Sequence, residues 1–139
     1  MTDNPRTEGL ARDVWSTMAD LVINHDRKRE VVEATGISFA KTRALRRVAR
    51  QPLPMGELAT LLTMDPPNVT TLIDDLQDAG LVQRRPHPTD RRVMLVVATA
   101  AGRRIARQAD DILDRPPAGL VTLPARDLEE LRRILASIA

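Results

Sequence analysis

Apolar side chains recur at spacings of three and four along most of the chain, and this periodicity predicts a mainly helical fold. Ser38, Asp65 and Thr99 stand where helix N-caps are expected, and Gly36 and Gly80 stand where helices should stop. The pattern predicts six helices, over residues 8–34, 39–50, 55–62, 66–79, 100–114 and 124–138.

A change of pattern follows the fourth predicted helix. Residues 81–85 and 93–97 are rich in β-branched and apolar side chains, whereas Pro86 to Arg92 between them is polar and rich in turn formers. This is the pattern of a hairpin with a long basic tip. Two helices joined by a short turn and followed by such a hairpin have the order of a winged helix-turn-helix. The expected fold class is therefore mainly α with a small β-hairpin wing.

The winged helix needs only about residues 36–99, yet the chain ends carry apolar stripes of their own. Because such stripes must be buried against something, we expect 8–35 and 100–139 to form a helical dimerisation region, with 1–139 as a single domain. A monomer that closes on itself is the alternative that the sequence leaves open.

Charge is segregated along the chain, although the net charge is only +2. Residues 36–51 carry five basic groups and no acid, 52–83 carry five acids and no base, and 84–107 carry seven arginines against one acid, Asp90. Most of the basic residues are arginine, the side chain suited to bidentate phosphate contacts. This distribution favours a polyanion partner, with solvated helix faces as the plain alternative.

Several functional classes are disfavoured by composition. The chain has no cysteine and two histidines far apart in sequence, so no cofactor or metal is expected. It contains no HExxH, GxSxG, P-loop or GxGxxG motif, and the adjacent acids Asp74 and Asp75 point apart on a helix, so enzymatic activity is not expected. With no membrane-spanning run and no secretion signal at its N-terminus, a cytoplasmic protein is expected.

The sequence resembles the MarR family of transcriptional regulators over about residues 10–138. The resemblance is carried by Leu76 to Arg84, which matches the pattern LxxxGLVxR, by the Asp90-Arg91-Arg92 wing, and by the Thr99–Gly102 pattern TxxG. It implies a helical homodimer with two winged DNA-binding lobes. The implied partners are an inverted-repeat operator in duplex DNA and a second copy of the chain, and the implied activity is transcriptional repression.

The resemblance places the helix over 66–79 in the major groove. Its expected contacts to bases or phosphates are Pro67, Asn68, Thr70 and Thr71. Many relatives carry arginine around the positions of Thr71 and Asp75, whereas this helix has three aspartates and no base. A capped surface helix that meets only water, or a winged-helix scaffold that binds protein instead of DNA, therefore remains open.

In the family the wing aspartate orients an arginine that enters the minor groove, which maps onto Asp90 and Arg92. A local ion pair that stabilises the turn is the alternative. The further expected phosphate contacts are Arg84, Arg85, His87, Arg91, Lys41 and Arg43. The family often responds to small aromatic or phenolic effectors, and the implied pocket would be lined by Trp15, Met18, Val22, Phe39 and Leu45, for which core packing is the alternative.

Overall fold

The computed structural model describes residues 4–139, which divide into two compact units. One unit is the winged-helix lobe, Arg27–Asp114; the other consists of the two chain ends, up to Asp26 and from Arg115 on. The lobe is larger than the expected 36–99, because a helix on each side of that range packs with it.

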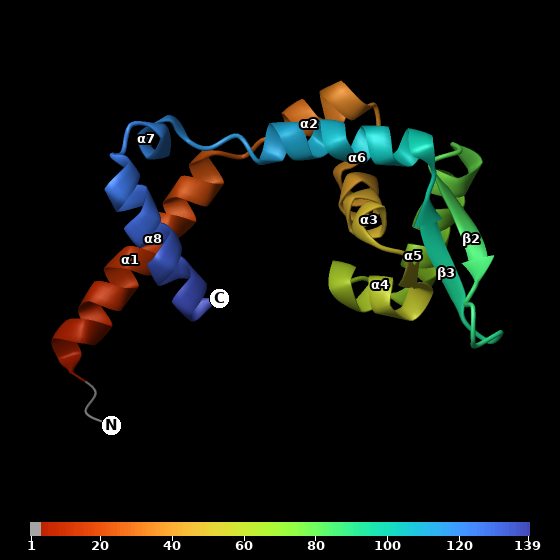
Figure 1. The fold of residues 1–139 in the computed structure, drawn as a ribbon, viewed down its shortest axis with the longest axis horizontal. Coiled ribbons are helices and arrows are strands. Elements are labelled where there is room, and N and C mark those ends of the chain that lie inside the picture. Colours follow the sequence, from red (N-terminus) through yellow and green to blue (C-terminus); the bar gives the residue numbers. More distant parts are fainter. Residues whose placement is uncertain (1–3) are drawn as a thin grey trace. The chain divides into compact units, whose positions relative to one another are not determined.

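The lobe contains five helices and a small sheet (Figure 1). In chain order they are α2 (Lys28–Thr35), α3 (Phe39–Arg50), β1 (Leu53–Pro54), α4 (Met55–Leu62), α5 (Pro66–Asp78), β2 (Val82–Pro86), β3 (Met94–Ala98) and α6 (Ala100–Leu113). The expected helices over 39–50 and 55–62 are confirmed at both ends. Ser38 caps α3 as predicted, since its side chain accepts a hydrogen bond from the Lys41 N–H at 3.3 Å.

The sheet is antiparallel, in the order β1-β3-β2. Val96 lies opposite Leu53 of β1 on one side and opposite Arg84 of β2 on the other. The sequence pattern predicts no strand at β1. Leu53 is nevertheless buried and pairs with β3, so this short strand joins the end of α3 to the base of the wing.

The lobe has a core of its own. The helix α5 buries one apolar stripe at helical spacing, formed by Val69, Leu72, Ile73 and Leu76. They pack in one cluster with residues of α3, α4, the sheet and the start of α6. A second, smaller cluster joins α2 to α6. The helix α6 contributes buried residues to both clusters.

Gly102 shows why the TxxG pattern belongs at the start of α6. A Cβ atom added there would lie 2.0 Å from the Leu81 carbonyl oxygen. That carbonyl accepts the Thr99 N–H at 3.0 Å, and the Thr99 hydroxyl donates to the Gly80 carbonyl at 2.7 Å. The same hydroxyl caps α6 by accepting the Gly102 N–H at 3.0 Å. The wing and α6 therefore meet too closely for any side chain at this position.

The chain ends form α1 (Pro5–Asn24), α7 (Ala118–Val121) and α8 (Ala125–Ile138). The single helix expected over 8–34 is wrong, because the chain leaves the helix at His25 and starts again at Lys28. Asn24 and Asp26 favour a helix end at this point, since short polar side chains compete for backbone hydrogen bonds. No described residue of this unit is buried, although its helices carry the expected apolar stripes. No helix among residues 4–139 is long and apolar enough to cross a membrane.

Candidate nucleic-acid interface

The outer face of α5 presents the four predicted groove residues, Pro67, Asn68, Thr70 and Thr71, all of them exposed. The two threonine hydroxyls donate to backbone carbonyls one turn earlier, at 3.0 Å for Thr70 and 3.2 Å for Thr71. A hydroxyl has one proton and two lone pairs, so both groups are left as acceptors. This arrangement suits amino groups on base edges better than phosphate oxygens, which accept and do not donate.

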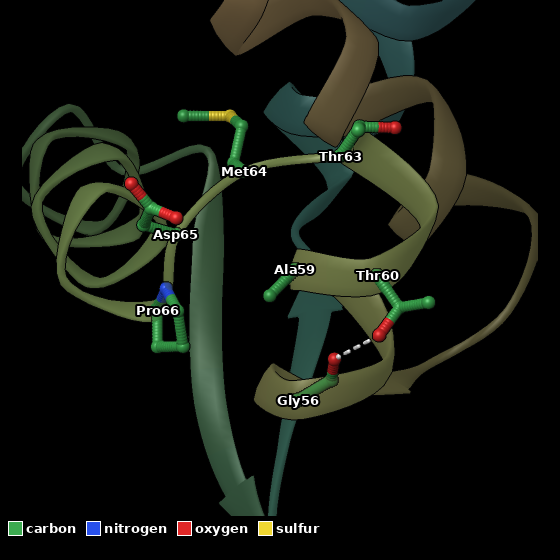
Figure 2. A pocket seen from close by; sticks show the side chains of 7 residues that line it. All are labelled: Gly56, Ala59, Thr60, Thr63, Met64, Asp65 and Pro66. Carbon is green, nitrogen blue, oxygen red and sulfur yellow. Dashed lines mark hydrogen bonds between the residues drawn. The ribbon is translucent and has the colours of Figure 1, made fainter.

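The turn between α4 and α5 is compact. Thr63 ends α4 in a left-handed conformation, with φ of 54°, which a β-branched residue adopts rarely. Asp65 occupies the predicted N-cap position of α5, but its side chain makes no capping hydrogen bond. An open hollow of about 420 Å³ lies at this turn (Figure 2). It is lined by Gly56, Ala59, Thr60, Thr63, Met64, Asp65 and Pro66, and so includes none of the residues expected to bind an effector.

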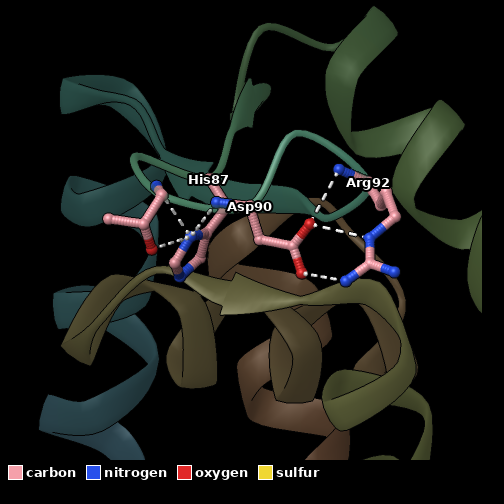
Figure 3. A network of polar contacts seen from close by, with 4 residues as sticks. His87, Asp90 and Arg92 are labelled. Atoms are coloured by element: carbon pink, nitrogen blue, oxygen red, sulfur yellow. Dashed lines mark hydrogen bonds and ion pairs between the residues drawn. The ribbon is translucent and has the colours of Figure 1, made fainter.

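The tip of the wing is organised around one carboxylate (Figure 3). Asp90 accepts from the Arg92 backbone N–H at 3.1 Å and from its Nε and Nη2 at 3.1 and 3.3 Å. The Arg92 side chain remains 90% exposed. His87 stabilises the turn, because its Nδ1 accepts hydrogen bonds from the backbone N–H groups of Thr89 and Asp90, both at 3.2 Å. The ion pair between Asp90 and Arg92 therefore orients the exposed Arg92 guanidinium.

Hydrogen bonds from the Arg92 side chain and backbone hold the pKa of Asp90 below its ordinary value, with a smaller contribution from the nearby His87 ring. The carboxylate is therefore ionised at neutral pH and available to orient Arg92. Arg91 is exposed at the same tip and forms no ion pair with any of residues 4–139. Arg91 and Arg92 are therefore the exposed cations at the tip of the wing.

Arg84 was expected to contact phosphate, but its side chain is paired with residues of α5. Its guanidinium forms an ion pair with Asp74 of α5 and a hydrogen bond to Gln77, both at 2.5 Å. The Arg84 side chain is only 23% exposed. It ties β2 to α5. Its neighbour Arg85 is exposed and donates to Gln83 on the same strand at 3.2 Å.

Lys41 of α3 likewise forms an ion pair with α5, through Asp75. Its Nζ lies 3.5 Å from Asp75 Oδ2, and its side chain is 32% exposed. Arg43 is exposed, but it stands about 200° around α3 from Lys41, because successive residues turn by about 100°. The two residues expected as neighbouring phosphate contacts thus face opposite sides of α3.

The five residues expected to line an effector pocket fall in both units. Trp15 and Val22 of α1 are 70% and 74% exposed, and Met18 is half-buried. Leu45 is fully buried in the lobe core, and Phe39 packs against the smaller cluster between α2 and α6, where the Lys28 ammonium lies 5.5 Å from its ring centroid. The burial of Leu45 favours core packing, the alternative to an effector contact for this residue.

Comparison with known proteins gives a consistent result. The sequence profile of the MarR family matches residues 35–93. Within these residues the chain is similar to the MarR family. An uncharacterised helix-turn-helix-type transcriptional regulator of Mycobacterium leprae is 34% identical over 74 residues, which cover 52% of each chain. The chain spans about half the length of the curated relatives it matches.

Two solved structures extend the likeness in fold to nearly the whole chain. A MarR family protein of Bacillus stearothermophilus superimposes with a TM-score of 0.79 over 99% of this chain and 96% of its own, at 22% identity, which shows a shared fold. CouR of Rhodococcus jostii RHA1, solved bound to p-coumaroyl-CoA, has a TM-score of 0.64 at 26% identity and covers 90% of this chain and 88% of its own.

The MarR resemblance drawn from the sequence is thereby confirmed, as is the mainly helical winged fold. What the sequence alone did not reveal is the role of Asp74, Asp75 and Gln77 as partners of Arg84 and Lys41. The signal was present in the acidic block that lies between two basic blocks. Opposite charges in adjacent segments that fold against each other are expected to pair, but sequence spacing does not show which do so.

Proposed function

We propose that this chain is a DNA-binding transcriptional regulator of the MarR type, with α5 in the major groove and the wing at the minor groove. The supporting observation is the Asp90–Arg92 pair, which holds an exposed guanidinium at the wing tip. A narrow minor groove concentrates negative potential and favours an inserted arginine. Asn68 with Thr70 and Thr71 offers the polar contacts to base edges.

The proposed active species is a homodimer. The terminal helices leave Leu10, Val14 and Trp15 of α1, and Ile134 and Ile138 of α8, exposed within a single chain. Apolar helix faces of this extent call for a covering surface, and a second copy supplies one by twofold symmetry. Two lobes related in this way would read an inverted repeat with half-sites about 34 Å apart. The proposed regulatory mode is repression.

A small-molecule effector is the proposed release signal. The support is the likeness to CouR, whose structure was solved with p-coumaroyl-CoA. An aromatic or phenolic ligand would act by favouring a lobe spacing that does not fit the operator. Trp15, Met18 and Val22 on α1 remain the side chains proposed to contact it.

The test is selection from a random duplex library, followed by binding to the selected sequence at two salt concentrations. Tight binding that falls steeply with salt is expected, since each neutralised phosphate adds about one unit to the log–log slope. The acidic α5 favours one competing function, a winged-helix scaffold for a protein partner. Absent or salt-insensitive DNA binding would favour the scaffold and contradict the proposal.

A further inference from the structure

Two cations from neighbouring elements form ion pairs with α5, the proposed recognition helix. Arg84 of β2 reaches Asp74 at 2.5 Å, and Lys41 of α3 reaches Asp75 at 3.5 Å. Consecutive residues stand about 100° apart on a helix, so the two pairs attach to different sides of α5. Arg84 also donates a hydrogen bond to Gln77, so its guanidinium contacts two residues of α5.

These contacts explain how a helix with three aspartates can serve a DNA-binding lobe. Asp74 and Asp75 are each about half exposed, and ion pairs in such positions contribute little to folding stability. Their larger consequence is electrostatic. Arg84 and Lys41 each have a carboxylate as partner, and a phosphate oxygen would have to displace that carboxylate to bind them.

We propose that Asp74 and Asp75 are specificity-determining residues that limit sequence-independent DNA binding. They hold Arg84 and Lys41 against α5 and withhold both cations from the phosphate backbone. Sequence-independent affinity comes mainly from cations that neutralise phosphates, so withholding two of them lowers it for every duplex. Discrimination then depends more strongly on the polar face of α5 and on Arg92. This inference rests on the DNA-binding function proposed above.

Arg84 and Lys41 act here as positioning residues. Each links α5 to a different neighbour, in addition to the buried apolar stripe of α5 that turns Thr71 and Asn68 outward. A phosphate contact and a positioning residue have distinguishable signatures. Removing a phosphate contact lowers the salt slope by about one, whereas removing a positioning residue lowers operator affinity and leaves the slope unchanged.

The decisive variant is the Asp74→Asn, Asp75→Asn double substitution, which keeps the side-chain shape and frees both cations. Binding is measured by fluorescence anisotropy across a salt series with two duplexes. One duplex is selected from a random library by the wild-type chain, and the other is its scrambled counterpart of equal length. We expect the slope to steepen by about two on both duplexes, and scrambled-duplex affinity near 0.1 M salt to rise by about tenfold or more. The ratio of the two affinities falls.

The matched control is Asp78→Asn. Asp78 is exposed on the same side of α5 as Asp74, one turn further on, and forms no ion pair within the described chain. Its substitution removes an identical charge and frees no cation, so the slope should stay at the wild-type value. A second comparison is Arg84→Gln, for which operator binding should weaken with an unchanged slope. Melting temperatures establish that each variant is folded, and each single aspartate variant is expected to steepen the slope by about one.

The outcomes separate this inference from the proposed function. A wild-type chain that binds neither duplex contradicts the DNA-binding proposal itself. A wild-type chain that selects an operator, with slopes unchanged in the double variant, leaves the regulator in place and overturns the role given to Asp74 and Asp75. Equal steepening in Asp78→Asn also overturns it, because the effect would then come from net charge and not from released cations.

Discussion

The winged-helix lobe and the terminal helices carry the same kind of apolar stripe, but only the lobe covers its own. Ile73 on α5 is fully buried, whereas Val22 on α1 and Ile138 on α8 are 74% and 72% exposed. Both regions show the helical spacing of three and four. Periodicity therefore identifies which face of a helix is apolar, and it does not show whether the same chain will cover that face.

The difference extends to how the two regions tolerate added volume. The lobe interlocks closely, down to the contact between Gly102 and the Leu81 carbonyl. The helix α1 has open space around Gly9, where an added Cβ would meet nothing within 4 Å. The same chemical change should therefore have opposite effects in the two regions.

The largest expected effect follows from that contrast. Gly102→Ala should destabilise the lobe by about 3 kcal/mol or more, because the backbone of the wing or of α6 must move to admit the methyl group. Gly9→Ala should instead stabilise α1 by up to about 1 kcal/mol through helix propensity. Chemical unfolding of both variants measures the two free energies. Equal effects at the two glycines would remove the distinction between the regions.

The second prediction concerns the uncovered stripe. Ile134→Asp should leave the lobe folded and weaken the proposed dimer by about 2 kcal/mol per protomer, the value of one buried aliphatic side chain. Analytical ultracentrifugation over a concentration series gives the dissociation constant. Glu129→Ser, a change at a polar exposed position of the same helix, is the control. A dimer unaffected by Ile134→Asp would place the covering surface elsewhere.

The ends of the lobe helices were predictable because local chemistry fixes them. Ser38 and Thr99 each supply a capping hydroxyl next to the helix that they begin, and Gly80 adopts the expected left-handed conformation with φ of 76°. The break between α1 and α2 was missed, since no proline marks it. Its residues, Asn24 to Asp26, only favour a helix end and do not force one.

The wing was likewise within reach of sequence reasoning, because Asp90 and Arg92 are two residues apart and pair locally. The partners of Lys41 and Arg84 were not, since these pairs join different elements, 34 positions apart for Lys41–Asp75 and 10 for Arg84–Asp74. Composition indicated that these cations face a polyanion. In the folded lobe, Lys41 instead pairs with Asp75 and Arg84 pairs with Asp74. Tertiary pairing decides which charges remain available.

The third prediction sharpens the functional side of the comparison. Arg92→Ala should weaken operator binding by about 1–3 kcal/mol while the dimer stays intact. Arg132→Ala, an exposed arginine on α8, should change it little, since the proposed interface lies in the lobe. Titration of the selected duplex with both variants measures the effect. Unchanged affinity in Arg92→Ala would remove the wing from the mechanism.

The smallest expected effect compares one carboxylate in each region. Hydrogen bonds from Arg92 lower the pKa of Asp90, and a hydrogen bond from Arg133 lowers the pKa of Glu130. A carboxyl whose pKa is lower in the folded than in the unfolded state stabilises the fold above its unfolded value. For Asp90 that contribution is present above pH 3.8 and is lost as the pH falls through the lower, folded pKa. Carbon-detected NMR titration should place the Asp90 midpoint below 3.8, and Arg92→Gln should raise it while Glu130 stays unchanged. An Asp90 midpoint that is the same in both proteins would mean that the exposed pair does not persist in solution, and Arg92 would then reach DNA without being held in place beforehand.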